Sequence, residues 1–244
     1  MPLVEAAVDT IESALSAERA GAGRIELCAS LSDAGITPSG GLIAAAVERC
    51  RIPVFVLIRP RGGSFGYSDG EMEIMVRDIA LVKSLGAHGV VAGVLQPNAM
   101  IDVKKVRMLV SAAQPLPVTF HRAFDYASNR AESLEELIDA GVARVLTSGG
   151  ANTALEGASG IAALVRQARG RIAIVAGGGI RENNVREVVA LTGVTEVHAR
   201  ISSIVGAAGG RGGKIKLRKR LPDDESAWEE LDEHRMRDLV QQAG

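Results

Sequence analysis

Eight short apolar runs alternate with longer helical patterns along the 244 residues of this chain. Most of the short runs are continuously apolar and rich in β-branched residues, which is typical of parallel strands covered on both faces. They predict strands at 3–8, 24–27, 54–59, 89–95, 117–121, 144–147, 171–176 and 196–199. The other segments predict helices at 10–20, 39–49, 71–85, 103–113, 133–140, 153–168, 181–191 and 225–242.

Eight strand–helix units favour a closed (β/α)₈ barrel, the TIM barrel fold, formed by one α/β domain over residues 1–244. The alternative is an open doubly wound sheet, which commonly carries a GxGxxG motif after its first strand, whereas the glycines here cluster after the seventh. Residues 206–220, GAAGGRGGKIKLRKR, interrupt the alternation. We expect them to form a flexible basic loop, either a mobile active-site loop or a disordered insert.

Charge and cysteine content exclude several classes of protein. The formal net charge of −1 gives no field that favours nucleic acid or membrane as a partner. Cys28 and Cys50 form no CxxC pattern, which argues against a disulfide scaffold or a structural zinc site. The sequence contains neither an apolar run of about 20 residues nor the features of a signal peptide. We therefore expect a cytoplasmic protein that binds a small molecule or an ion.

Polar residues gather at the predicted carboxyl ends of the strands, which meet at one mouth of a barrel and carry its active site. They include Glu26, Cys28, Arg59, Arg61, His121, Arg122, Asp125, Ser148, Gly177, Gly178, Gly179 and His198. This concentration indicates a functional site at the mouth.

The segment AGGGIRENN after the seventh strand predicts an anion site. Glycines let the backbone approach a ligand closely, and the helix that follows offers free N–H groups and the positive end of its dipole. Ser148 opens a second glycine turn, SGG, after the sixth strand. The alternative is that these glycines serve only the backbone torsions of tight turns.

Four further side chains are candidates for the same anion site: Arg59, Arg61, Arg122 and His198. Arg59 and Arg61 are two residues apart and share a face if the strand continues, and guanidinium groups suit carboxylate and phosphate. The alternative for Arg59 is an ion pair inside the barrel with Glu5 or Glu26.

His121, in the segment TFHRAFD, is the candidate general acid or base, with Asp125 orienting its ring or Glu26 sharing the proton transfer. The alternative is a hydrogen-bonded core histidine.

The segments RIELCASLSDAGITPS, IPVFVLIRPRGGSFGYSD, LPVTFHRAFD, RVLTSGGANTALEG and IVAGGGIRENN resemble, in this order, the copper homeostasis protein CutC family. The resemblance implies a cytosolic TIM barrel, a homo-oligomer and a link to copper homeostasis, with Cu(I) bound in some members. By position, Cys28 matches a proposed copper ligand, whereas Ala7 stands where the family often has a second cysteine. Cu(I) prefers soft thiolate or thioether ligands.

Two hypotheses follow. The resemblance indicates a copper-handling protein that binds Cu(I) through Cys28, with His121 or His198 assisting. The residues alone favour an enzyme that performs acid–base chemistry on a small anionic or phosphorylated metabolite, because a metal carrier has no use for so many arginines at the mouth.

Overall fold

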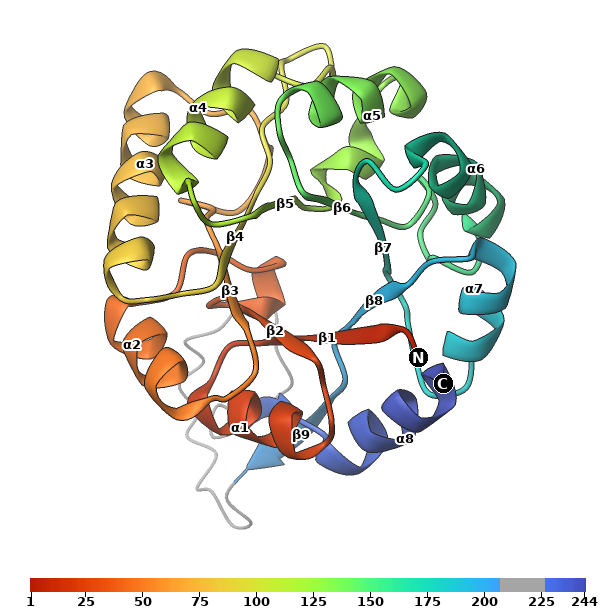
Figure 1. Cartoon of the computed structure of the whole chain (residues 1–244). Coiled ribbons are helices and arrows are strands. Elements are labelled where there is room, and N and C mark those ends of the chain that lie inside the picture. The colour runs from red at the N-terminus through yellow and green to blue at the C-terminus, as the bar shows by residue number, and fades with distance from the viewer. Residues whose placement is uncertain (207–226) are drawn as a thin grey trace, which may run out of the picture.

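The computed structural model describes residues 1–206 and 227–244, and within them eight parallel strands close into a barrel in sequence order. Figure 1 shows the strands at the centre and a ring of helices around them. The strands are β1 Leu3–Val8, β2 Arg24–Leu27, β3 Val54–Leu57, β4 Gly89–Ala92, β5 Val118–Phe120, β6 Arg144–Thr147, β7 Ala173–Gly177 and β8 Glu196–Ala199. The predicted TIM barrel is confirmed.

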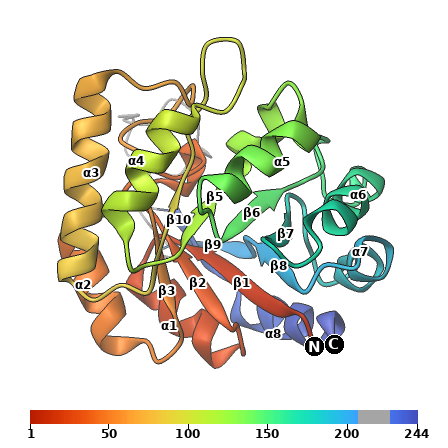
Figure 2. The same cartoon turned by 45° about the horizontal axis from the view of Figure 1, so that its top comes forward.

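The helices around the barrel are α1 Ile11–Arg19, α2 Gly40–Arg49, α3 Asp69–Ser84, α4 Val103–Ala113, α5 Arg130–Asp139, α6 Ala158–Ala168, α7 Val185–Thr192 and α8 Glu233–Ala243. Two short 3₁₀ helices, η1 Leu31–Asp33 and η2 Arg122–Tyr126, follow β2 and β5. Both chain termini lie side by side next to α8 (Figure 2). In the described part of the chain, each helix is too short or too polar to cross a membrane.

The strands β3 and β4 end earlier than predicted. We expected a strand through residue 59, but β3 ends at Leu57. The Ile58 N–H still donates to the Val91 carbonyl of β4, but the Arg59 N–H donates to the Thr37 hydroxyl at 2.9 Å. The chain after β3 is therefore loop, and it is free to form the wall of the site.

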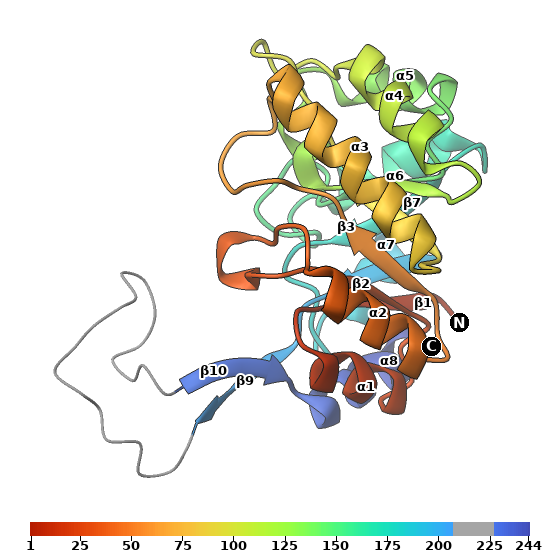
Figure 3. The ribbon, with the colours of Figure 1, turned by 90° about the vertical axis from the view of Figure 1, so that its left-hand side faces the viewer.

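The region around the last predicted helix differs most from expectation. α8 begins at Glu233 because Asp232 caps it, accepting from the Arg235 N–H at 3.1 Å. Residues expected to be helical form β10 Ala227–Leu231, which pairs antiparallel with β9 Ser202–Gly206. This two-stranded ribbon projects from the barrel (Figure 3). Apart from Gly206, the predicted basic loop at 206–220 lies outside the described residues.

The inside of the barrel is partly charged. Side chains of a strand point to alternate faces, so residues two apart share the interior. Glu5 of β1 lies in register with Arg24 of β2 and with His198 of β8, and Glu5 and Arg24 are 1% and 3% exposed. Because isolated buried charges are costly, these groups must pair with one another.

Candidate functional site

A cavity of about 460 Å³ opens at the carboxyl ends of the strands, and we call it the inner pocket. Its polar lining comes from five strands and the segments that follow them: Glu26, Arg59, His121, Arg122, Gly178, Gly179, Arg181, His198 and Arg200. Ala7, Leu57, Phe65, Tyr126, Leu146 and Ile180 supply much of its apolar lining. The structure thus brings together seven of the predicted site residues: Glu26, Arg59, His121, Arg122, Gly178, Gly179 and His198.

A buried ion-pair layer supports the pocket from inside the barrel. Arg24 pairs with Glu5 and, at 2.5 Å, with Glu196, and Arg144 lies 3.3 Å from Glu196. The guanidinium groups of Arg24 and Arg144 each pack on the ring of Phe55, at 4.9 and 5.1 Å. The layer therefore fixes Glu5, which in turn holds a residue of the pocket itself.

That residue is His198, whose Nδ1 lies 2.7 Å from the Glu5 carboxylate and 4.0 Å from Glu26. Burial opposes the charged imidazole, but the charge of Glu26 and the hydrogen bond with Glu5 raise the pKa of His198 overall. Burial alone would raise the pKa of Glu5, but the hydrogen bonds and charges of His198 and Arg24 lower it to about 2. The Glu5 carboxylate thus favours the charged form of His198, and a charge on His198 in turn favours ionised Glu26.

Glu26 is the acidic side chain of the inner pocket. It is 7% exposed, and its Oε2 has no hydrogen-bond partner among the described residues. Burial raises the pKa of Glu26 to about 7, against the opposing effect of the His198 charge. A carboxyl with this pKa is divided between its two protonation states at neutral pH, as a general acid or base requires.

His121 faces the pocket as a neutral ring. Its Nδ1 accepts a hydrogen bond from the Ala123 N–H at 3.2 Å, so the ring proton lies on Nε2, which has no partner in the described part of the chain. Burial lowers the pKa of His121 to about 3, and the Arg59 charge acts in the same direction. At neutral pH this histidine is a hydrogen-bond donor and not an acid.

Gly93, directly after β4, makes room for this ring, because a Cβ there would lie 2.5 Å from it. The sequence signal was a glycine beside an otherwise apolar strand, which we did not interpret as part of the site.

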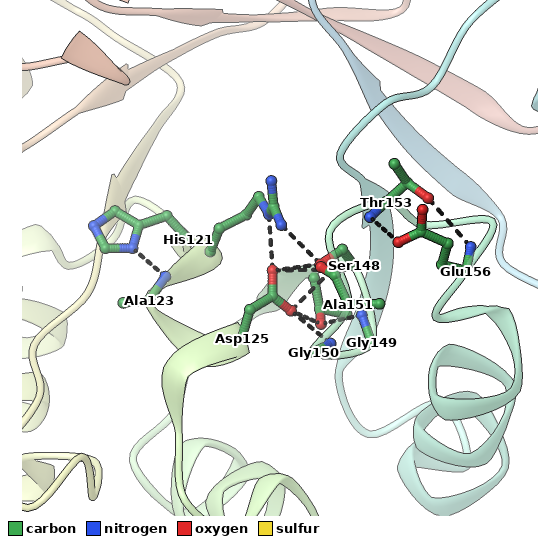
Figure 4. Close-up of polar contacts among 11 residues, drawn as sticks. His121, Ala123, Asp125, Ser148, Gly149, Gly150, Ala151, Thr153 and Glu156 are labelled. Atoms are coloured by element: carbon green, nitrogen blue, oxygen red, sulfur yellow. Dashed lines mark hydrogen bonds and ion pairs between the residues drawn. The ribbon is translucent and has the colours of Figure 1, made fainter.

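Asp125 does not contact His121, in contrast to the prediction that it orients the ring. Figure 4 shows its carboxylate enclosed by the turn after β6. It accepts hydrogen bonds from the backbone N–H groups of Ser148, at 2.9 Å, and Gly150, at 3.2 Å. It also accepts from the Thr147 hydroxyl, at 2.5 Å, and from Arg122 Nε, at 2.7 Å. Asp125 thus fills the second predicted anion turn and positions Arg122.

Ser148 is fully buried and, like Asp125, does not line the inner pocket. Its hydroxyl accepts from Arg122 at 2.7 Å, so it acts on the pocket through that arginine.

The glycine turn after β7 is open. Gly178 and Gly179 have φ of 101° and 70°, which only glycine adopts readily. No described residue accepts a hydrogen bond from their N–H groups. Arg122 borders this turn, since a Cβ on Gly178 would lie 3.1 Å from its guanidinium. Gly177 differs, because it packs inside the barrel against Leu146 and does not line the pocket.

Two arginines that line the inner pocket, Arg181 and Arg200, were not among the predicted anion-site residues. Arg181 follows the open turn, and Arg200 follows β8, pairing with Glu229 and donating to the Leu31 carbonyl at 3.0 Å. The signal was available, since Arg200 directly follows β8 and Arg181 lies in the loop that follows β7, the region where barrels bind phosphate.

Arg59 pairs with neither Glu5 nor Glu26 in the described structure. Its Nη1 donates to the carbonyls of Asp33, Ala34 and Gly35, at 3.1, 3.2 and 2.8 Å. Its Nε lacks a partner. Arg59 therefore stabilises the segment after β2 while keeping one donor available at the pocket.

Arg61 lies outside the inner pocket. Its Nε is 2.5 Å from Glu71, and it donates to the carbonyls of Ser64 and Gly66 at 2.9 and 2.8 Å. Because the strand does not continue past Leu57, Arg59 and Arg61 do not share a face.

Cys28 directly follows β2 and is separated from the inner pocket by apolar side chains. It is fully buried among Phe55, Leu57, Val91 and Leu31, and burial raises the pKa of its thiol well above the usual range. The cavity lining contains Ala7 and lacks Cys28.

The metal-ligand types available do not fit Cu(I). Glu5, Glu26 and His198 offer ligand atoms within 4.8 Å of one another. Carboxylate oxygens suit hard cations, whereas Cu(I) prefers soft sulfur. The buried, protonated Cys28 thiol adds no accessible sulfur to this group.

The closed barrel and the polar pocket at the carboxyl ends of its strands define a TIM-barrel protein, with its candidate site where proteins of this fold carry theirs. Residues 2–203 match the model of the CutC family, and the chain belongs to that family. This confirms the predicted resemblance.

Individual relatives agree. The copper homeostasis protein cutC homolog of Mus musculus is 49% identical over 201 residues, which are 82% of this chain and 74% of the relative. A family protein CutC from Histophilus somni is 42% identical over 225 residues, 92% and 93% of the two chains. The crystal structure of CutC from Streptococcus agalactiae matches with a TM-score of 0.78 at 36% identity, covering 81% of this chain and 98% of that one.

Proposed function

We propose that the inner pocket performs acid–base catalysis on a small anionic molecule, an organic phosphate or carboxylate. The observation that carries the proposal is Glu26. Its carboxyl has a pKa of about 7 and an Oε2 without a hydrogen-bond partner in the described chain. It lines the same cavity as four arginines, namely Arg59, Arg122, Arg181 and Arg200.

Glu26 and His121 have complementary roles. Ionised Glu26 takes a proton from the substrate and, once protonated, returns it. The imidazolium of His198, held by Glu5, stabilises the ionised form of Glu26. The neutral His121 ring donates from Nε2 to a substrate oxygen on which negative charge develops. Of the three predicted catalytic residues, the proposal keeps Glu26 as the proton carrier and His121 as a hydrogen-bond donor, whereas Asp125 acts only through Arg122.

The anionic group of the substrate binds at the open turn after β7. The N–H groups of Gly178 and Gly179 have no acceptor among the described residues and are available to an anion, and Arg122, Arg181 and Arg200 supply the charge. Asp125 and Ser148 act indirectly by holding Arg122 in place.

Hydrogen exchange tests the proposal without a known substrate. The protein is incubated in D₂O with dihydroxyacetone phosphate or fructose 6-phosphate, and deuterium incorporation next to the carbonyl is followed by NMR. We expect both to bind in calorimetry and exchange to be catalysed. The rate should rise with pH through about 7, because ionised Glu26 is the base. If the protein neither bound these phosphates nor catalysed their exchange, the proposal would be wrong.

Cu(I) binding at Cys28 is the second candidate, and the name of the relative from Mus musculus favours it. We expect a Cu(I) titration against a competing chelator to show binding no tighter than that of an isolated thiol. Cys28→Ser should change it little, because the thiol is buried and protonated. Tight stoichiometric binding that Cys28→Ser abolishes would reverse the order of the two candidates.

The proposal includes a cytoplasmic location and a homo-oligomer, which the sequence resemblance supports. Light scattering after size-exclusion chromatography measures the second of these.

A further inference from the structure

A second cavity, of about 910 Å³, adjoins the inner pocket, and we call it the outer pocket. It lies between the segments that follow β3 and β4, which Figure 3 shows above the ribbon of β9 and β10. Its polar lining includes Gly63, Ser64, Tyr67, Gln96, Asp102 and Lys105. We infer that the outer pocket binds a neutral, hydroxylated ring, a sugar, whose phosphate occupies the inner pocket. This inference rests on the proposed function.

The two pockets share part of their wall. Arg59, Phe65 and Tyr126 line both of them. The Phe65 ring lies between, with its centroid 4.9 Å from that of His121 and 5.8 Å from that of Tyr126. A molecule that reaches past Phe65 therefore contacts His121 at one end and the outer pocket at the other.

Two buried polar atoms near the shared wall have unused hydrogen-bonding capacity. The Arg59 guanidinium interacts with the Tyr67 hydroxyl, and neither that hydroxyl nor Arg59 Nε has another hydrogen-bond partner among the described residues. Tyr67 and Arg59 are each only 5% exposed. A buried polar group without a partner costs about 1–3 kcal/mol. A substrate hydroxyl meets this need, since it accepts from Arg59 and exchanges a hydrogen bond with Tyr67.

Apart from Arg59, which both pockets share, the charged side chains of the outer pocket interact with each other. Lys105 lies 4.0 Å from the Asp102 carboxylate and donates to the Tyr67 carbonyl at 2.6 Å. Beyond Arg59, the outer pocket thus offers no unpaired charged side chain among the described residues. The portion of the ligand bound here is neutral.

Tyr126 gives the outer pocket an aromatic surface. Its side chain is 69% exposed although it packs near Phe65. An exposed aromatic face beside hydroxyl and amide groups suits a sugar, whose C–H face packs on the ring while its hydroxyls form hydrogen bonds. The substrate class is therefore a sugar phosphate.

Two phosphates of different length test the inference. Dihydroxyacetone phosphate fits the inner pocket alone, whereas fructose 6-phosphate extends into the outer pocket. Calorimetry should show Tyr67→Phe weakening fructose 6-phosphate about three- to tenfold, the effect of one neutral hydrogen bond, and leaving dihydroxyacetone phosphate unchanged. Ser84→Ala removes an exposed hydroxyl on α3 and should change neither affinity. The Tyr67→Phe ring is retained, so circular dichroism should confirm an unchanged fold.

Each other outcome has a separate meaning. Equal binding of the two phosphates, with no effect of Tyr67→Phe, would overturn the outer subsite while leaving the inner anion site intact. If neither phosphate binds the wild type, the proposed function fails and the inference fails with it. Adenosine monophosphate bound more tightly than fructose 6-phosphate, in a Tyr67-dependent way, would overturn the sugar in favour of a nucleoside.

Discussion

Replacing Glu26 with glutamine should slow the hydrogen exchange of the bound phosphate by about 10²–10⁴-fold, the usual contribution of a general base. Glutamine matches the neutral carboxyl in shape but cannot take up a proton. The affinity for dihydroxyacetone phosphate should change little, since the anion is held by the turn after β7 and its arginines. Exchange kinetics by NMR, together with calorimetry, separate the two effects. Glu48→Gln, an exposed change on α2, should leave the rate unchanged.

The same variant tests the titration of Glu26 in a readout that needs no substrate. Its folded-state pKa of about 7 lies above the ordinary 4.5. The stability that neutral Glu26 contributes is thus complete below about pH 4.5 and is lost as the pH rises through 7. Glutamine stays neutral, so Glu26→Gln should gain on the order of 3 kcal/mol over wild type between pH 5 and pH 8, at about 1.4 kcal/mol per pKa unit. A difference independent of pH would show that Glu26 titrates normally.

Replacing Arg24 with methionine should lower the free energy of unfolding by about 3–5 kcal/mol, as removal of one partner from a buried ion pair does. Arg24 is 3% exposed and pairs with both Glu5 and Glu196. Methionine fills similar space but leaves two carboxylates with less compensating charge. Urea unfolding at pH 7 measures the loss.

The matched control is Arg77→Met on α3. Arg77 and Glu73 are 76% and 64% exposed, and such a pair contributes less than about 1 kcal/mol. The Arg24 effect should also shrink as the pH falls, because protonation of Glu5 removes the charge that Arg24 neutralises. Equal losses in the two variants would contradict the structural role of the layer.

The barrel was predictable because its strands are short, continuous apolar runs and its helices lie between them at regular spacing. The bounds of β1, β2, β6, β8 and α4 agree with the predicted ranges. The ribbon of β9 and β10 was missed because its strands have little of the apolar alternation that identifies a sheet. AWEEL reads equally well as the first turns of a helix, and only the pairing with β9 decides otherwise.

The site was predictable to the extent that it depends on strand ends. Glu26 and His198 follow from the alternation of a strand, which directs them inward. Arg61 and Asp125 could not be placed in the same way, because their partners depend on the paths of loops. Cys28 has the predicted direction, yet its burial depends on Leu31 and Leu57 covering it, which no local pattern reveals.

The Asp125 carboxylate in the turn after β6 has a consequence for how many charged groups a ligand carries. The chain has glycine turns after both β6 and β7, and within residues 1–206 and 227–244 Asp125 already satisfies the N–H groups of the first. A bisphosphate would bring its second phosphate to a place where the amides are taken and a fixed negative charge repels it. If the proposed function is correct, we therefore expect molecules with one phosphate to bind more tightly than those phosphorylated at both ends, because the Asp125 carboxylate occupies the second glycine turn.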